Sequence, residues 1–418
     1  MTFARALAVL EERQEAKIEL GLARMRRHLK DLGDPQAELA CFHVAGTNGK
    51  GSVCAMLESV LREAGYKTGL YTSPHLFNVR ERIKLGGRPI SERDFARLMA
   101  KTTAADPGKK LTYFELLTSV AFQYFFEKKA AAVVLETGLG GRLDATNVVD
   151  KPLACLITSI DFDHMAYLGE TLPAIAGEKA GIFKAGVPAI CPPLKAPALA
   201  VLKARARKLG APLFVVRPPW KAVAVDWRGN RQTLSDGRSR FSVSLLGSRQ
   251  GVNLALARAA VAAAAPRLTV SETAWRRGLA RLRWPGRFEV RRIGERTLIL
   301  DGAHNPEAMA QLARTLGASP WARKPLRWIV GVMKDKDYPG IIRQVAPLMR
   351  DAVAVRPPSP RALDALTLAG EIRRQAPRAH VTVESDPRTA LRSWLRSPAA
   401  AGTAVLCGSF YLVGQAHA

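Results

Sequence analysis

The segment Gly46-Thr-Asn-Gly-Lys-Gly-Ser52 combines small side chains with one lysine and one serine hydroxyl. Small residues let backbone N–H groups approach an anion closely. Lys50 adds a positive charge, and the hydroxyl of Ser52 is a suitable ligand for a metal ion. These residue types at this spacing therefore predict a loop that holds the phosphates of a nucleotide.

The flanking sequence supplies the setting that such a loop requires. Residues 39–44 are apolar and predict a short buried strand, while residues 53–64 carry apolar side chains at helical spacing. A helix that starts at the loop adds the partial positive charge of its N-terminus. The spelling differs from the common pattern G-x-x-x-x-G-K-[ST], because Val44 stands in place of the first glycine and Gly51 is inserted after the lysine. An ordinary strand-to-helix turn is therefore the alternative interpretation.

Other polar side chains follow predicted strands at the points where those strands end. They are Ser73 after residues 68–71, Glu136 at the end of residues 131–136, and His164 after residues 153–160. Ligands of an open parallel sheet bind outside the carboxyl ends of its strands, so these side chains and Ser52 can converge on one cleft. A carboxylate, an imidazole and hydroxyls suit Mg²⁺ that is held partly by phosphate and water. His164 alone is a weak sign, because a single histidine is more often a satisfied structural residue than a ligand.

A similar cluster, Asp301-Gly-Ala-His-Asn-Pro306, follows the apolar residues 297–301. Asp301 and His304 could touch the ribose or the γ-phosphate of a nucleotide. The alternative is a turn in which Asp301 caps a helix over residues 306–316.

Strands and helices alternate along most of the chain, which is typical of an α/β fold. Residues 1–38 predict helices, and continuous apolar runs predict buried parallel strands. Residues 213–245 differ, because short alternating runs with turn residues between them predict a small antiparallel sheet. Further helices are predicted over residues 112–128 and 253–265, and further strands over residues 187–191, 328–332, 352–355, 381–383 and 403–407.

The length of 418 residues favours two domains. The motif Trp284-Pro-Gly-Arg287 interrupts the alternation and marks the predicted junction. We expect a mostly parallel sheet domain with the phosphate loop over residues 1–287 and a smaller, Rossmann-like α/β domain over residues 288–418.

The composition excludes several classes of protein. The sequence contains no run of about eighteen apolar residues, so we expect no membrane-spanning helix. Five scattered cysteines without a C-x-x-C pair indicate buried thiols in a reducing compartment, and we expect a cytoplasmic protein without membrane partners. The net charge of +27 could indicate nucleic-acid binding. The basic residues are spread along the chain, however, so we expect no nucleic-acid partner and attribute the charge to compositional bias.

Taken together, the motifs resemble those of the folylpolyglutamate synthase/dihydrofolate synthase family of the Mur ligase superfamily. The phosphate-loop motif of that family has a glycine directly after the lysine, as this sequence has after Lys50. The likeness extends from about residue 20 to residue 414 and rests on Gly46–Ser52, Ser73-Pro-His75, Glu136–Asn147, Asp163-His164, Glu178–Ile182, Pro285-Gly-Arg-Phe288 and Asp301–Pro306.

The resemblance implies an ATP-dependent ligase that joins L-glutamate to dihydropteroate or to the glutamate tail of a folate through an acyl phosphate. It implies ATP contacts at Thr47, Asn48, Gly49, Lys50, Gly51, Ser52, Asn253, Arg287, Asp301 and His304. It implies one or two Mg²⁺ ions held by Ser52, Ser73, Glu136 and His164, and catalytic roles for Lys50, His164 and Lys179. Lys179 matches a lysine that the family carboxylates with CO₂, whereas a plain phosphate-facing lysine is the alternative.

Contacts to the pterin are implied at Leu143, Asp144 and Ala145, and we expect Thr112, Tyr113 and Phe114 to lie along the same pocket. The partners are then small molecules, and we expect a monomer. Three rival interpretations remain at this point, namely a Mur-type ligase acting on a peptidoglycan precursor, a basic nucleic-acid-binding NTPase and a non-catalytic relative. The run Gly138–Asn147 argues against the first, only the net charge favours the second, and the intact set of expected ligands argues against the third.

Overall fold

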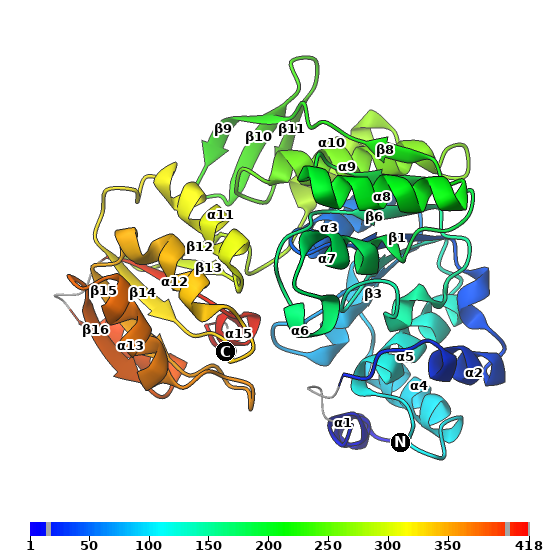
Figure 1. The fold of residues 1–418 in the computed structure, drawn as a ribbon, viewed down its shortest axis with the longest axis horizontal. Helices are drawn as coiled ribbons and strands as arrows, with labels where there is room; N and C mark the ends of the chain where they lie inside the picture. Colours follow the sequence, from blue (N-terminus) through cyan, green and yellow to red (C-terminus); the bar gives the residue numbers. More distant parts are fainter. Residues whose placement is uncertain (14–17, 398–401, 417–418) are drawn as a thin grey trace. The chain divides into compact units, whose positions relative to one another are not determined.

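The computed structural model describes residues 1–13, 18–397 and 402–416. The chain forms two compact units (Figure 1). The first unit comprises Met1–Pro219 and Val252–Arg281, and the second comprises Trp220–Gly251 and Leu282–Ala418. The segment Trp220–Gly251 therefore packs with the C-terminal residues rather than with the residues on either side of it in the sequence. The predicted domain boundary at residues 287/288 stays a prediction.

The first unit is built on an eight-stranded sheet in the order β4-β3-β2-β5-β1-β6-β7-β8. The six strands β2, β5, β1, β6, β7 and β8 run parallel, and β3 and β4 add an antiparallel edge beside β2. The strands are β1 (Cys41–Ala45), β2 (Thr68–Tyr71), β3 (Ile83–Leu85), β4 (Arg88–Pro89), β5 (Ala132–Glu136), β6 (Ala154–Ile157), β7 (Ala189–Cys191) and β8 (Leu213–Val215). The central strands are buried along their whole length, as their continuous apolar runs predict.

Helices cover this sheet and supply separate apolar clusters. One cluster joins α1, α4 and α5 to the β2–β5 side, with Tyr71, Phe95 and Phe122 fully buried, and another joins α7 and α8 to the β6–β7 side. The helices are α1 (Phe3–Glu11), α2 (Ala23–Asp31), α3 (Lys50–Glu63), α4 (Glu92–Ala104), α5 (Tyr113–Glu127), α6 (Met165–Leu168), α7 (Leu172–Ala180), α8 (Ala196–Leu209), α9 (Gln250–Ala263) and α10 (Glu272–Arg281), with 3₁₀ turns η1 (Pro35–Glu38), η2 (Val79–Arg82) and η3 (Ala145–Val148). The first residues of α9 belong to the second unit.

The second unit contains a six-stranded sheet in the order β12-β13-β17-β14-β15-β16, in which only β12 is antiparallel. A separate antiparallel sheet has the order β11-β10-β9. The strands are β9 (Lys221–Asp226), β10 (Arg231–Ser235), β11 (Arg240–Val243), β12 (Glu289–Ile293), β13 (Arg296–Asp301), β14 (Leu326–Val330), β15 (Asp351–Val355), β16 (His380–Glu384) and β17 (Thr403–Cys407).

The larger sheet of this unit packs on an apolar core that includes Trp328, Ile341 and Leu368. Its helices are α11 (Pro306–Gly317), α12 (Tyr338–Val345), η4 (Ala346–Leu348), α13 (Ala365–Gln375), α14 (Pro387–Arg396) and α15 (Phe410–Gln415). None of the described helices is long and apolar enough to cross a membrane.

Most predicted elements are confirmed, including the mostly parallel phosphate-loop sheet and the second α/β unit. The assignment of residues 213–216 to the antiparallel sheet is wrong, because β8 pairs in parallel with β7. The parallel pairing is possible because the fourteen-residue helix α8 connects the two strands. It returns the chain to the end of the sheet at which β7 begins, as a parallel connection requires. Residues 221–243 do form the antiparallel sheet. All five cysteines are buried and free.

Candidate active site

The loop between β1 and α3 has a backbone that only glycine permits at two positions. Gly46 has a φ of 149°, and a Cβ there would lie 2.0 Å from the hydroxyl oxygen of Thr158. Gly49 has a φ of 88° and is the N-cap residue of α3, so the cap position offers no side chain to the first N–H groups of that helix. Helix N–H groups without a side-chain cap are suited to an anion. The loop thus has the geometry that the glycine spacing predicts.

The residues that follow β6 hold this loop in place. The hydroxyl of Thr158 donates to the carbonyl of Asn48 at 2.7 Å, and the Asn48 N–H donates to the hydroxyl of Ser159 at 2.9 Å. Thr47 uses its hydroxyl twice, donating to the carbonyl of Asp161 and accepting from the Asp161 N–H, both at 3.1 Å. The loop is therefore a fixed cradle rather than a free turn.

Two further side chains that were predicted to contact the nucleotide, those of Lys50 and Asn253, lie against this loop. The ammonium of Lys50 donates to the carbonyls of Gly46 and Thr47 at 2.9 and 3.2 Å, so it folds back over the cradle. The amide oxygen of Asn253 lies 3.0 Å from the position of a Cβ on Gly49, which brings the first turns of α9 against the loop. The structure thus brings Asn253, over 200 residues distant in sequence, to the predicted phosphate site.

The predicted metal ligands lie at neighbouring strand ends. Glu136 ends β5, the strand between β2 and β1, and its carboxylate accepts the backbone N–H of Ser73 at 3.1 Å. Ser52 is buried in the first turn of α3. His164 follows β6, and its Nε2 lies 3.9 Å from a carboxylate oxygen of Asp163.

The described residues contain no group of three His, Cys, Asp or Glu side chains placed to hold a metal. The predicted set includes only two residues of those types, Glu136 and His164, and the contacts above join Glu136 to Ser73. The metal set therefore stays a prediction, with its hydroxyl members supplied by Ser52 and Ser73.

Lys179 lies on α7 and is almost completely buried. Burial lowers the pKa of its amine to about 7, with the charge of Lys50 acting in the same direction and the carboxylates of Asp163, Asp144 and Asp161 opposing it. A lysine with this pKa is largely an uncharged nucleophile slightly above neutral pH.

The loop that follows β5 is fastened by Asp144. One carboxylate oxygen accepts the N–H groups of Gly138 and Leu139, each at 2.8 Å, and the other accepts the N–H and the hydroxyl of Thr146 at 3.0 and 2.5 Å. Burial raises the pKa of Asp144, although these bonds favour its ionised form. The carboxylate is engaged by its own loop, so its observed role is to shape residues 138–146.

This fastening extends to the strand that precedes the phosphate loop. The hydroxyl of Thr146 donates to Asp144, so it accepts from Nε2 of His43 at 2.8 Å. His43 lies on β1, and burial lowers its pKa to about 3, which keeps the ring neutral. Leu143 is half-buried, and Ala145 is buried at the start of η3.

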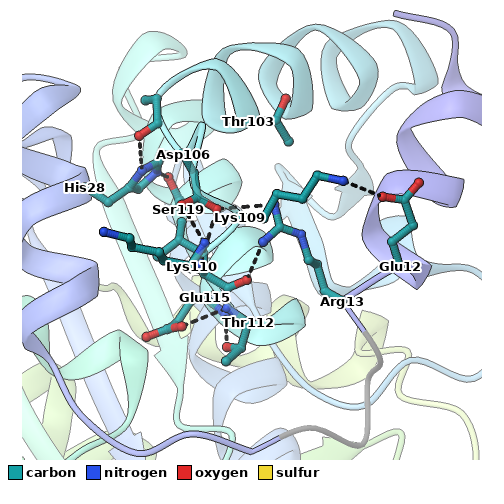
Figure 2. A network of polar contacts seen from close by, with 12 residues as sticks. Glu12, Arg13, His28, Thr103, Asp106, Lys109, Lys110, Thr112, Glu115 and Ser119 are labelled. Carbon is teal, nitrogen blue, oxygen red and sulfur yellow. Dashed lines mark hydrogen bonds and ion pairs between the residues drawn. The ribbon is translucent and has the colours of Figure 1, made fainter.

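A polar network fixes the start of α5, where the remaining substrate candidates lie (Figure 2). Arg13 and Asp106 form an ion pair at 3.2 Å with both side chains less than 10% exposed, and Asp106 also accepts the N–H groups of Lys110 and Leu111. Thr112 then caps α5 through a reciprocal pair of bonds with Glu115. The hydroxyl of Thr112 therefore has a structural partner at the helix start.

The network places Phe114 against the loop that Asp144 fastens. A Cβ on Gly138 would lie 2.6 Å from the Phe114 ring, so the glycine leaves the space that the ring occupies. Tyr113 is stacked by the guanidinium of Arg82 at 5.4 Å. The structure thus joins Phe114 to the loop of Leu143–Ala145, although the two segments were predicted from separate motifs.

In the second unit, Asp301 ends β13. Its two carboxylate oxygens accept the N–H groups of Phe288 and Ala303, each at 2.8 Å, and burial raises its pKa while Arg287 opposes the shift. The helix cap is Asn305, which accepts the N–H of Ala308. The alternative in which Asp301 caps the helix is therefore wrong.

The other two nucleotide candidates of this unit share one aromatic neighbour. The guanidinium carbon of Arg287 lies 4.3 Å from the ring centre of Phe410, and the ring centres of His304 and Phe410 are 5.5 Å apart. No motif in the sequence indicated Phe410 as a site residue, because an aromatic side chain at the start of a short apolar segment is typical of a hydrophobic core.

Comparison with known proteins decides the family. The Mur ligase middle domain model matches residues 44–261, and the model of the Mur ligase glutamate ligase domain matches residues 286–410. A probable dihydrofolate synthetase of Schizosaccharomyces pombe is 39% identical over 332 residues, covering 78% of this chain and 79% of the relative. The dihydrofolate synthetase of Saccharomyces cerevisiae is 33% identical over 423 residues, covering 95% and 97%. The chain belongs to the dihydrofolate synthase/folylpolyglutamate synthase family of Mur ligases.

Solved structures of this family agree with the fold over its whole length. The structure of Escherichia coli FolC in complex with DHPP and ADP superposes with a TM-score of 0.86 at 33% identity, covering 100% of this chain and 97% of that chain. The bifunctional folylpolyglutamate synthase/dihydrofolate synthase of Yersinia pestis, in complex with AMPPNP and a Mn ion, has a TM-score of 0.82 at 34% identity, covering 100% and 97%. The family resemblance predicted from the motifs is confirmed, and the chain is a Mur-type ligase.

Proposed function

We propose that this ligase uses ATP to join L-glutamate to dihydropteroate, to the glutamate tail of a folate, or to both. The observation that carries the proposal is the fixed phosphate loop, with Lys50 folded over it and a helix N-terminus behind it whose N-cap residue is a glycine. The relatives named dihydrofolate synthetase support the pterin substrate, and the ADP and AMPPNP complexes of relatives support the nucleotide. The peptidoglycan alternative has weaker support, because the relatives compared above are folate enzymes.

The proposed chemistry has two steps. A carboxylate oxygen of the acceptor attacks the γ-phosphorus of ATP, ADP leaves, and an acyl phosphate forms. The neutral amine of L-glutamate then attacks the carbonyl carbon, the tetrahedral intermediate expels inorganic phosphate, and the nitrogen loses a proton. Two anions must meet in the first step, so positive charge at the phosphates is the main requirement.

This chain's own residues meet that requirement in the following way. N–H groups of the segment Thr47–Ser52 would cradle the phosphates, and Lys50 would turn from the loop carbonyls to the phosphate oxygens. Asn253 would extend the nucleotide site from the loop, since its amide already lies against Gly49. Arg287, Asp301 and His304 are proposed as further nucleotide contacts from the second unit.

A divalent metal fits the donor set of the first unit. Glu136 is a buried carboxylate at a strand end with the Ser73 backbone on one oxygen, and Ser52 places a hydroxyl at the first turn of the phosphate helix. We propose that Ser52, Ser73, Glu136 and His164 hold Mg²⁺, which would supply charge neutralisation at the phosphates. His164 is then a ligand rather than a general base.

Lys179 is proposed to react with CO₂ to give a carbamate. Its lowered pKa leaves an uncharged amine whose nitrogen can attack the carbon of CO₂ and then lose a proton, so that a neutral amine becomes an anionic carbamate. Three nearby carboxylates would disfavour that anion, so the carbamate requires a cation beside it, which Lys50 or a bound metal supplies.

For the acceptor, we propose a pocket beside Phe114 and the loop that Asp144 fastens. Leu143 and Ala145 lie on this loop, and the ring of Phe114 against Gly138 provides an apolar face for a flat pterin. Asp144, with its oxygens engaged, would act by holding the loop, and Thr112 and Tyr113 by placing Phe114.

The test is phosphate release by the purified protein with ATP, L-glutamate and one acceptor at a time. Dihydropteroate and tetrahydrofolate are the two folate-type acceptors, and a UDP-sugar acid with its amino acid is the peptidoglycan-type control. Phosphate release with either pterin that depends on L-glutamate supports the proposal. Release with the UDP-sugar acid alone would overturn it. The predicted monomeric state and cytoplasmic location need separate measurements by light scattering and by cell fractionation.

A further inference from the structure

Phe410 lies at the meeting point of three segments of the second unit. It starts α15, three residues beyond Cys407, and Cys407 is the register partner of Asp301 on the neighbouring strand β13. Because β13 and β17 pair in parallel, Phe410 and Asp301 both lie at the carboxyl ends of the strands of this sheet.

The Phe410 ring contacts two polar side chains, the guanidinium of Arg287 and the imidazole of His304. The guanidinium carbon of Arg287 lies 4.3 Å from the ring centre, which is a close stacking distance. The ring of His304 lies 5.5 Å away at 59°. A Cβ on Gly302 would come within 2.3 Å of Phe410, so the glycine allows the ring to lie directly on the chain between Asp301 and His304.

The backbone around this ring is already fixed by other bonds. Asp301 accepts the N–H groups of Phe288 and Ala303, and Nδ1 of His304 donates to the carbonyl of Gly302 at 2.8 Å. These bonds set the course of the two loops. The long Arg287 side chain, whose charge acts on the Asp301 carboxylate, has many rotamers to lose when it binds a ligand.

We propose that Phe410 is a positioning residue, whose ring holds the guanidinium of Arg287 and the imidazole of His304 in the orientation in which they meet the nucleotide. The inference deepens the proposed function and rests on the nucleotide contacts assigned there to Arg287 and His304. Stacking on the ring orders Arg287 before ATP binds, so less conformational entropy is lost on binding. The ring is half-buried, so it borders the surface that carries these side chains instead of lying in the core.

The experiment compares Phe410→Leu with the unchanged protein. Leucine keeps an apolar contact on Gly302 but has no ring face for Arg287. We expect the KM for ATP to rise about three- to tenfold, as the loss of one cation–π contact predicts, with a smaller change in kcat and in the KM for the pterin acceptor. Direct titration with ADP, without turnover, should show the same loss of affinity. Tyr338→Leu is the matched control, because Tyr338 is a half-buried aromatic packed against the core of the same unit and starts a different helix, α12.

A mutant cycle tests whether Phe410 acts through Arg287 and His304. In an Arg287→Ala/His304→Ala background, Phe410→Leu should change the KM for ATP by less than about twofold, because both partners of the ring are already gone. Additive effects would overturn the inference, as would an unchanged ADP affinity in Phe410→Leu or an equal loss in Tyr338→Leu. Should Phe410→Leu lower the thermal midpoint so far that the protein does not fold, Phe410→Met takes its place in the same cycle.

The cycle also separates this inference from the proposed function. If Arg287→Ala weakens ADP binding while Phe410→Leu does not, only the positioning role fails. If neither Arg287→Ala nor His304→Ala changes ADP affinity, the nucleotide contacts assigned to the second unit fail, and the role of Phe410 fails with them.

Discussion

Lys179 offers the sharpest test of the chemistry, because its burial changes how much neutral amine exists at a given pH. With an ordinary lysine pKa of 10.5, about one amine in 300 is uncharged at pH 8, whereas with a pKa of about 7 roughly nine in ten are. The population that can attack CO₂ is therefore over a hundredfold larger at Lys179 than at an exposed lysine. We expect Lys179 to carry the carbamate in bicarbonate-containing buffer at pH 8 and Lys179→Met to lose it.

The assay is ¹³C NMR of the protein equilibrated with ¹³C-labelled bicarbonate. Lys184→Met is the matched control. Lys184 lies just beyond α7, the helix that carries Lys179, and burial also lowers its pKa. Its ammonium donates to the carbonyl of Asn147. A carbamate signal present in the unchanged protein and in Lys184→Met, but absent in Lys179→Met, is the expected result. A signal that persists in Lys179→Met, or that never forms, would refute the reasoning.

The same pKa fixes the sign of a stability effect. Between about pH 7 and pH 10.5 the unfolded chain binds a proton at Lys179 that the folded chain does not bind. The free energy of unfolding contributed by this residue should therefore fall as the pH is lowered through that range and change little below it. Urea unfolding in CO₂-free buffer should show a weaker pH dependence for Lys179→Met than for the unchanged protein. An unaltered slope would contradict the lowered pKa.

Three further substitutions, with Arg26→Ala as the control for the third, test the phosphate loop, the metal set and the network at the start of α5. Lys50→Ala should lower kcat by about 100-fold or more, because it removes the positive charge at the phosphates, and the thermal midpoint should not change. Full turnover with unchanged ATP affinity would exclude that role of Lys50. Glu136→Gln should raise the Mg²⁺ concentration for half-maximal activity about tenfold, which an unchanged metal titration would disprove. Arg13→Ala should lower the free energy of unfolding by about 3–5 kcal/mol, because it leaves the buried Asp106 carboxylate without its counter-charge. Arg26→Ala, which breaks an exposed pair with Asp150, should change it by less than about 1 kcal/mol in the same urea titration.

The sequence predicts the parallel sheets well because both faces of their strands are covered. β1, β5 and β6 are buried at every position, so each appears as a short and nearly continuous apolar run, with His43 in β1 and Glu136 at the end of β5 as the exceptions. The phosphate loop is equally readable, since Gly46 and Gly49 adopt positive φ values that other residues rarely adopt. In these places one local physical constraint dictates the residue type.

Edge strands are harder to assign because solvent covers one side of them. β8 has two exposed residues, Phe214 and Val215, and its short alternating pattern resembles that of the antiparallel strands that follow it. Its true partner, β7, lies beyond a fourteen-residue helix, so only the tertiary pairing distinguishes a parallel edge from a hairpin. The second unit shows the same limit at β12, whose mixed charged and apolar residues gave no strand signal.

Sequence motifs also do not distinguish a carboxylate that binds ligand from one that fastens backbone. Asp144 and Asp301 both lie in motifs that point to a ligand, yet each uses both carboxylate oxygens on N–H groups of adjacent loops. Burial raises the pKa of both, so each needs those N–H groups to stay ionised, and each loop needs the carboxylate to hold its shape. We therefore expect replacement of either residue to disturb the backbone that it holds and, through that backbone, ligand binding. The side chains that this backbone presents, Phe114 against Gly138 and Arg287 on Phe410, are then the ones whose substitution can change affinity while the fold is retained.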